Sequence, residues 1–282
     1  MSGLLTDMAR LSYERYEHAK AVVPEAKLWA RASTMAPAPA LKLSAEGFDL
    51  IAECKLHSPS AGDLSNHTSD VQSRVAAYGL GGAAAVSVLT EPTRFGGALE
   101  HLTQATQVLT PLGVPTMRKD FLVEPYQVME ARVAGAGGVL VIARMLDKSR
   151  ITALLDCAAM LRLFVLIEAF DAEDIALIND VLSARKNHDE KILVGINCRD
   201  LQSLQVNFER FAELVSLLPS EYPKVAESGV GNTEDVQRVV RLGFQMALIG
   251  TTLMNSPDPR ALAVELLQSG RKTALSLEML KL

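Results

Sequence analysis

The sequence predicts an α/β protein: a closed barrel of eight parallel strands, each followed by a helix, with extra helices at the N-terminus. Eight short, almost entirely apolar runs alternate with amphipathic stretches, a pattern typical of parallel strands covered by helices. Glycine stands at three joints where a helix ends and the next run begins, at 81–82, 137–138 and 243. Because no linker interrupts the eight units, a (β/α)8 TIM barrel fits them better than an open sheet.

The first 48 residues are expected to form a helical cap ahead of the barrel. Leucine and methionine recur at helical spacing from Leu4 until Pro24 breaks the pattern, and a second short helix is expected from Glu25 to Ala32. Residues 49–282 are then expected to form the barrel. On this interpretation the whole chain is one structural domain.

The strands and helices of the barrel follow from the order of the runs. The predicted strands are 49–55, 83–90, 115–120, 138–143, 164–169, 192–197, 224–228 and 246–250. Amphipathic periodicity predicts helices between them at 70–80, 125–134, 148–161, 172–184, 209–217, 233–242 and 259–267.

Composition excludes several classes of protein. The chain has 282 residues, 49% hydrophobic and 22% charged, which indicates a large core and argues against intrinsic disorder. A net charge of −5 without a basic run argues against binding to nucleic acid or to a membrane surface. No apolar stretch approaches the ~18 residues of a transmembrane helix, and the first residues do not resemble a signal peptide. We expect a cytoplasmic protein that is a monomer or a weak homodimer.

Polar or charged side chains end five of the predicted strands. The carboxyl ends of parallel barrel strands meet at one mouth, where active sites are built. A lone charge at a strand end is usually a solvated loop residue, but five such ends would gather acids and bases in one place. The residues are Glu53 and Lys55, Arg118, Lys119 and Asp120, Glu168, Asn197 and Arg199, and Glu227 with Ser228.

A phosphate site is expected beside this cluster. Barrel enzymes often bind phosphate with the loops after strands seven and eight. Here those loops begin with Ser228-Gly229 and Gly250-Thr251, which offer backbone N–H groups and hydroxyls. Taken alone, these glycines fit tight turns equally well.

Other motifs do not predict sites. Residues 79–84 match G-x-G-x-x-A but precede a strand instead of following one, so no dinucleotide site is expected. Cys54 and His57 are too few for a metal site, and no metal is predicted. The three cysteines include no C-x-x-C pair, which favours reduced thiols. Cys198 is better explained as a small buried core residue than as a reactive one.

Longer runs carry a resemblance to a known family. The runs IAECKLHSPSAG, SVLTEPTRFGG, MRKDFLVEPYQVMEARVAGAGGVLVI, VGINCRDL, VAESGV and ALIGTTLM resemble indole-3-glycerol phosphate synthase in order and spacing, from about Asp49 to Met254. The resemblance implies a carboxy-lyase of tryptophan biosynthesis. Its phosphorylated small-molecule substrate, 1-(o-carboxyphenylamino)-1-deoxyribulose 5-phosphate, would lose carbon dioxide and water as the indole ring closes. It implies no metal or organic cofactor.

The resemblance also implies roles for single residues. Lys119 matches the family's general acid, while Lys55 and Glu168 match the acid and base of the dehydration; which lysine serves which step stays open. Glu53, Asn197 and Glu227 match a polar shell around the lysines. Hydrophobic walls are matched by Phe95, Phe121 and Leu140, and other substrate-binding positions by Ser58, Arg199, Ser228, Gly229, Leu248, Gly250 and Thr251.

Three departures from the family pattern leave the proposed acids and bases in place. His57 and Ala61 stand where a cation is often found, which bears on phosphate affinity. Cys198 replaces a hydroxyl or amide neighbour, and 169–170 read Ala-Phe in place of a polar, histidine-containing continuation. Two alternatives remain open: a divergent relative that acts on a modified anthranilate-derived substrate, and a phosphosugar-binding barrel without turnover. Retention of all the proposed acids and bases weighs against the second.

Overall fold

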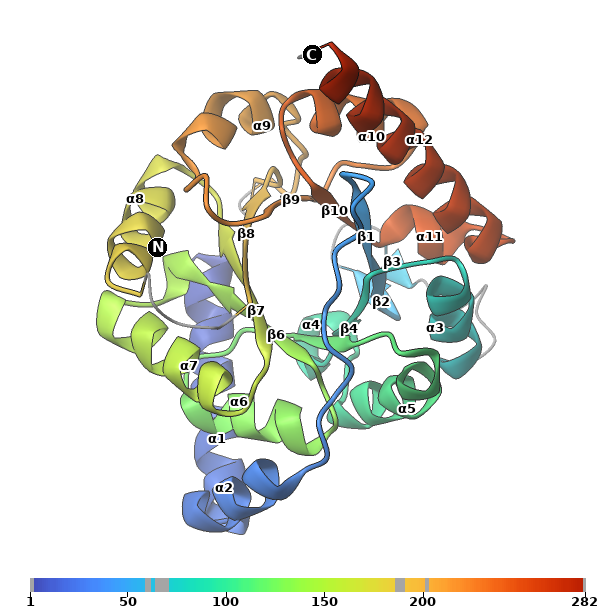
Figure 1. The fold of residues 1–282 in the computed structure, drawn as a ribbon. Helices are drawn as coiled ribbons and strands as arrows, with labels where there is room; N and C mark the ends of the chain where they lie inside the picture. The colour runs from blue at the N-terminus through green and yellow to red at the C-terminus, as the bar shows by residue number, and fades with distance from the viewer. Residues whose placement is uncertain (1–2, 59–61, 64–70, 186–190, 201–202, 281–282) are drawn as a thin grey trace.

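The structure, a computed structural model, describes residues 3–58, 62–63, 71–185, 191–200 and 203–280. Eight parallel strands close into a barrel, and helices form a ring around it (Figure 1). Around the barrel the strands follow the order β1 (Asp49–Cys54), β10 (Met246–Ile249), β9 (Lys224–Glu227), β8 (Ile192–Asn197), β7 (Phe164–Ala169), β6 (Gly138–Ile142), β5 (Thr116–Lys119) and β4 (Ala85–Leu89). The predicted fold is confirmed, and every predicted strand is present to within two residues at each end.

Each of the predicted helices is confirmed within the part of the chain that the structure describes, and the structure adds others. The outer ring contains α3 (Val71–Leu80), α5 (Leu99–Leu109), α6 (Pro125–Val133), α7 (Lys148–Met160), α8 (Ala172–Ser183), α9 (Glu209–Leu214), α10 (Thr233–Arg241) and α12 (Pro259–Met279). Helix α5 was not predicted, nor were the short helix α4 (Pro92–Phe95) and the hairpin of β2 (His57–Ser58) and β3 (Gly62–Asp63). A short helix, α11 (Thr251–Asn255), follows β10.

Helix α12 runs twelve residues past its predicted end at 267. Glycine normally weakens a helix interior, and Gly270 lies in this added part. The ring of Phe48 packs so closely on Gly270 that a Cβ there would overlap it. Close packing against Phe48 therefore explains why a poor helix former stands inside this helix.

The strands separate two packed layers of apolar side chains. Leu50 and Ala52 belong to the layer between β1 and the helices, whereas Ile51 belongs to the interior of the barrel. The interior layer is filled by side chains from the barrel strands, among them Ala85, Met117, Leu140, Leu166, Leu193, Val225 and Met246. The interior of the barrel is thus a packed apolar core, as in other barrels of this kind.

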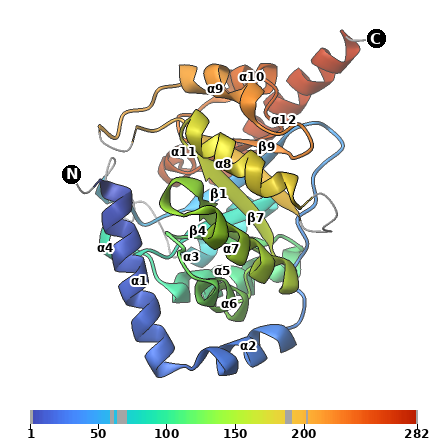
Figure 2. The same cartoon turned by 90° about the vertical axis from the view of Figure 1, so that its left-hand side faces the viewer.

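Two helices precede the barrel, α1 (Leu4–Val22) and α2 (Glu25–Thr34), and α1 runs along its flank (Figure 2). The α1 ring of Tyr16 meets the α6 ring of Tyr126 edge-on, with centroids 5.7 Å apart. The hydroxyl of Tyr126 donates to the carbonyls of Ala19 and Val23 at 3.0 and 2.9 Å. These contacts fix the C-terminal half of α1 against the barrel. No helix in the described part of the chain is long and apolar enough to cross a membrane.

Candidate active site

A cavity of about 580 Å³ lies at the carboxyl ends of the strands. It brings together polar residues from all five of the predicted strand ends, but not Arg118, whose guanidinium instead pairs with the carboxylates of Asp120 and Glu130. Lining it are Glu53, Lys55, Phe95, Lys119, Phe121, Leu140, Glu168, Asn197, Arg199, Glu227, Ser228, Gly229, Leu248, Gly250 and Thr251. The side chain of Ser58 and all of Ala61 lie outside the described residues.

Two lysines and three glutamates form the charged centre of the cavity. The ammonium of Lys119, at the end of β5, lies 3.3 Å from Oε2 of Glu168 on β7 and 3.6 Å from Oε2 of Glu227 on β9. The ammonium of Lys55, just after β1, lies 2.7 Å from Oε1 of Glu53, which is in β1. All five side chains are largely withdrawn from solvent, so these interactions are only weakly screened.

The pKa shifts in this centre follow from burial and from neighbouring charge. Burial favours neutral Lys119, but the carboxylates of Glu168, Glu227 and Glu53 outweigh it and raise the pKa of Lys119. Burial likewise disfavours ionised Glu53, yet Lys55 and Lys119 hold its pKa below the usual range. Lys119 is therefore protonated and Glu53 ionised at neutral pH.

Glu227 has the opposite property. It is completely buried, and burial together with the negative charge of Glu168 raises its pKa well above the usual range, against the lowering effect of Lys119. Two carboxylates this close repel each other when both are ionised, so Glu227 retains a proton more readily. The site thus holds a cationic acid, Lys119, beside carboxyl groups of unequal acidity.

Two glycines leave the space that these carboxylates occupy. A Cβ on Gly195, in β8, would overlap Oε1 of Glu227 on the neighbouring strand. A Cβ on Gly250, after β10, would overlap Oε1 of Glu53. Gly250 therefore has a steric role at the charged centre that the sequence analysis did not identify, in addition to its predicted place beside phosphate.

A chain of polar contacts continues from Glu168 along the end of β8. The side-chain amide of Asn197 donates to Oε1 of Glu168 at 3.1 Å, and its oxygen accepts from the backbone N–H of Arg199 at 2.9 Å. The guanidinium of Arg199 donates to the carbonyl of Leu204 at 2.7 Å. Cys198 between them is fully buried, which confirms the predicted core role, and burial raises the pKa of its thiol to about 11.

The loop after β9 has an unusual backbone conformation at the mouth. Ser228 adopts φ 65°, in the left-handed region that residues other than glycine rarely enter, and Gly229 follows with φ 72°. The thiol of Cys198 donates to the carbonyl of Ser228 at 3.3 Å. Local strain of this kind persists where the surrounding structure holds it, commonly at functional sites.

One side of the cavity is aromatic and aliphatic. The rings of Phe95, from α4, and Phe121, after β5, have centroids 6.0 Å apart. Leu140 of β6 also lines this side, and so do residues that the sequence analysis missed, above all Leu4 and Leu5 of α1 and Phe170 after β7. Helical spacing showed that α1 buries one face, but it carries no information on which part of the barrel that face meets.

Comparisons with known proteins show which family this chain is similar to. A family model described as indole-3-glycerol phosphate synthase matches residues 13–266. A protein of that name from Kineococcus radiotolerans is 38% identical over 229 residues, which cover 81% of this chain and 79% of that protein. Another from Beutenbergia cavernae is 39% identical over 255 residues, which cover 90% and 89%.

A solved structure of another enzyme shows the fold alone. The 3-hexulose-6-phosphate synthase of Salmonella typhimurium aligns with a TM-score of 0.60 at 12% identity, over 81% of this chain and 99% of that chain. Fold likeness at this identity says nothing of chemistry. The family assignment rests on sequence instead, because the family model matches residues 13–266, from within α1 to within α12. The chain belongs to the indole-3-glycerol phosphate synthase family, a family of carboxy-lyases in tryptophan biosynthesis.

Proposed function

We propose that the cavity converts 1-(o-carboxyphenylamino)-1-deoxyribulose 5-phosphate into indole-3-glycerol phosphate, carbon dioxide and water. The observation that carries this proposal is the position of Lys119, an ammonium group 3.3 Å from Glu168, in a cavity whose other side is aromatic. An acid, a base and an apolar wall for an aromatic ring are what this condensation requires.

In the first step Lys119 acts as the general acid. The ring carbon that carries the carboxylate attacks the ketone carbon, and the carbonyl electron pair takes a proton from Lys119. The raised pKa of Lys119 suits this role, because the group is protonated before the reaction begins. Carbon dioxide then leaves, and the electrons of the broken carbon–carbon bond restore the aromatic ring.

In the second step the new hydroxyl leaves as water. A lysine ammonium supplies the proton to the hydroxyl, and Glu168 removes a proton from the carbon between the nitrogen and the former ketone carbon, which forms the indole double bond. One proton is taken up from solvent in each turnover, because the substrate carboxylate departs as neutral carbon dioxide. Asn197 donates to Oε1 of Glu168 and leaves the other oxygen of that carboxylate beside Lys119.

The remaining residues bind the two ends of the substrate. Lys55 holds the substrate carboxylate, and Phe95, Phe121, Leu140 and Leu248 form the walls around the ring. The phosphate lies at the opposite end, against Arg199, the loops Ser228-Gly229 and Gly250-Thr251, and Ser58. Displacing water from such a cavity strengthens the charged contacts that remain.

We further propose that the enzyme works in the cytoplasm without a cofactor, as a monomer or weak homodimer. The three cysteines are buried and unpaired, which suits a reducing compartment.

Turnover of the substrate tests the function directly. Purified protein is incubated with the substrate, and the fluorescence of the indole product and the released carbon dioxide are followed together. We expect both in equal amounts. Substrates with a substituted anthranilate ring are assayed in parallel, because preference for one of them would favour the divergent relative. Binding without any product would favour the phosphosugar-binding barrel and contradict the proposal.

A further inference from the structure

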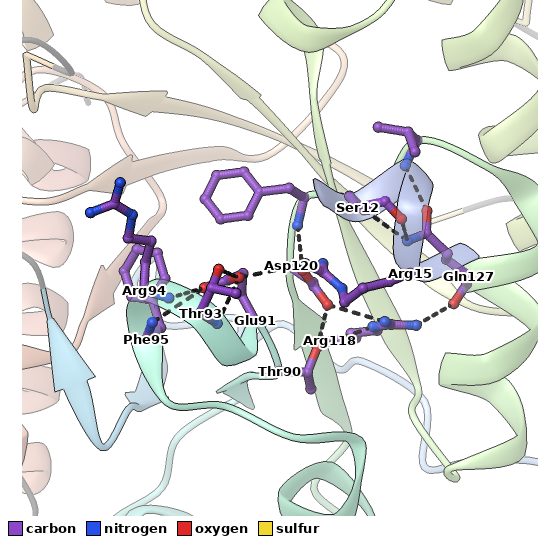
Figure 3. A network of polar contacts seen from close by, with 12 residues as sticks. Ser12, Arg15, Thr90, Glu91, Thr93, Arg94, Phe95, Arg118, Asp120 and Gln127 are labelled. Carbon is purple, nitrogen blue, oxygen red and sulfur yellow. Dashed lines mark hydrogen bonds and ion pairs between the residues drawn. The ribbon is translucent and has the colours of Figure 1, made fainter. Parts of the chain in front are cut away.

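A polar network that the proposed chemistry does not use adjoins the aromatic side of the cavity, and one of its members, Asp120, also lines the cavity (Figure 3). It joins α1 to the segments after β4 and β5 through Arg15, Thr90, Glu91, Arg118 and Asp120, which we call the Asp120 network. Arg15 is not among the described residues that line the cavity. Each of its two carboxylate partners, however, accepts a hydrogen bond from the backbone N–H of a residue in the aromatic wall.

The first partner, Asp120, fixes the backbone between Lys119 and Phe121. Its Oδ1 accepts from Arg15 at 2.7 Å and from the backbone N–H of Phe121 at 2.8 Å. Its Oδ2 accepts from Thr90 at 2.8 Å and from Arg118 at 3.0 Å. Burial disfavours its charge, but Arg118 and Arg15 outweigh this and keep the pKa of Asp120 below its usual range. Asp120 is therefore an ionised anchor in the middle of the network.

The second partner, Glu91, holds Phe95. Its side chain caps α4 by accepting from the backbone N–H groups of Thr93, Arg94 and Phe95 at 2.9, 2.7 and 3.2 Å. Glu91 is completely buried, and Oε1 lies 3.5 Å from Nη1 of Arg15. A buried carboxylate needs a compensating positive charge, and Arg15 supplies it.

Arg15 thus binds both carboxylates, one with each terminal nitrogen of its guanidinium. The planar fork of arginine fixes the separation of two acceptors in a way that a lysine ammonium does not. We propose that Arg15 is a positioning residue: through Glu91 and Asp120 it sets the spacing of Phe95 and Phe121, and so the shape of the wall that receives the substrate's aromatic ring. This inference rests on the proposed function for the identity of that ring.

The structure separates this role from simple attachment of α1. Gln127 of α6 donates to the hydroxyl of Ser12 on α1 at 2.8 Å, and Tyr126 holds the end of α1 independently. Removing Arg15 therefore leaves other contacts that keep α1 on the barrel. The expected consequence lies in α4 and Phe95, since Asp120 retains Arg118 whereas Glu91 loses its charge partner.

The test compares Arg15→Met with Arg10→Met in the full chain. Arg10 lies on the same helix in an exposed pair with Glu14, so it controls for loss of an arginine from α1. Dissociation constants are measured by calorimetry for anthranilate, which probes the aromatic end, and for inorganic phosphate, which probes the other end. For Arg15→Met we expect anthranilate binding and the KM to weaken about tenfold, with kcat within about threefold, because a wall contributes similarly to ground-state and transition-state binding. Phosphate binding is expected to stay within about twofold.

Two further variants show whether the effect passes through the wall. Arg15→Lys restores the charge but not the fork, so partial recovery of anthranilate binding is expected. In a Phe95→Ala background, Arg15→Met is expected to weaken anthranilate binding far less than in the wild type, because the wall that it positions is already absent.

The outcomes are distinct. Equal loss of anthranilate and phosphate binding, or additive effects of the Arg15 and Phe95 substitutions, would show a merely structural arginine and overturn the inference. If Arg15→Met binds anthranilate as tightly as the wild type does, and the wild-type protein turns over the substrate, the inference is overturned and the proposed function stands. A wild-type protein that binds anthranilate in an Arg15-dependent way but forms no indole product overturns the function and not the inference. Absence of anthranilate binding to a wild type that forms indole product overturns the inference and leaves the proposed function standing.

Discussion

Lys119 is held as a cation by its surroundings, since three carboxylates face a group that burial alone would neutralise. The same carboxylates differ among themselves: Lys55 and Lys119 keep Glu53 ionised, whereas burial and the charge of Glu168 raise the pKa of Glu227. Environments that push the pKa values of neighbouring groups apart are how one site supplies both acid and base. At the scale of single residues, we therefore expect substitutions that remove different charges of this centre to affect different steps of the reaction.

Replacing Lys119 with methionine keeps an unbranched side chain of nearly the same length and removes the acid. We expect kcat to fall by at least ~10²–10⁴-fold, the usual contribution of a general acid. The measurement is steady-state turnover, with circular dichroism to verify folding. Lys148→Met is the matched control, because Lys148 forms an exposed pair with Asp180 on the outer helices. Turnover of a folded Lys119→Met protein within a few-fold of wild type would remove Lys119 from the mechanism.

Glu168→Gln tests the later step. Glutamine keeps the size of the side chain but cannot take a proton, so we expect substrate to bind and the final proton removal to slow. In single-turnover experiments a ring-closed intermediate should accumulate, or conversion should be uniformly slow. Glu173→Gln, on the exposed face of α8, serves as the control. Normal kcat with a raised KM in Glu168→Gln would assign Glu168 to binding instead.

At the scale of elements, the packing of neighbouring strands at the charged centre limits which residues the strands can carry there. Gly195 lies in β8 opposite Val225 of β9, and the carboxylate of Glu227, two residues further along β9, occupies the space where a side chain on Gly195 would lie. Gly195→Ala should displace Glu227 or spread the two strands, at a cost of about 1–3 kcal/mol in the free energy of unfolding. We also expect a lower kcat.

Urea denaturation and turnover check this prediction together. Gly3→Ala is the control, since it adds the same methyl group into open space at an ordinary φ of −76°. A Gly195→Ala protein with unchanged stability and unchanged kcat would show that β8 and β9 adjust freely.

The elements also show what sequence patterns can and cannot predict. The strands were predictable because each is buried on both faces and so forms a continuous apolar run. Helix α5 carries Leu99, Leu102, Ala105 and Leu109 at helical spacing, so the sequence does contain a signal for this helix. The residues of the charged centre were predictable from their places at strand ends. The Asp120 network was not, because Arg15 reaches it from α1, and helical spacing does not tell which part of the barrel α1 contacts.

At the scale of the whole molecule, burial controls thiol chemistry. Burial raises the pKa of Cys54 and Cys157 to about 12 and that of Cys198 to about 11, and none of the three is more than 3% exposed. Because the thiolate is the reactive species, native protein at pH 8 should react with a chromogenic disulfide reagent at least ~10²-fold more slowly than a free thiol.

Denaturation should then expose all of these thiols together. In concentrated guanidinium we expect three equivalents to react, and the rate in native protein reports opening of the fold. A fast equivalent in the native state would identify a cysteine whose surroundings open locally. Free cysteine under the same conditions provides the reference rate.

Leu4 and Leu5 line the cavity at one end of α1, whereas the C-terminal helix α12 ends on the far side of the molecule (Figure 2). This asymmetry matters for how the protein is handled in the laboratory. A purification tag fused ahead of Leu4 would emerge beside the cavity, where it competes for the same apolar surface and alters measured affinities. A tag placed after α12 leaves that surface untouched, and kinetic comparisons among variants are best made in that format.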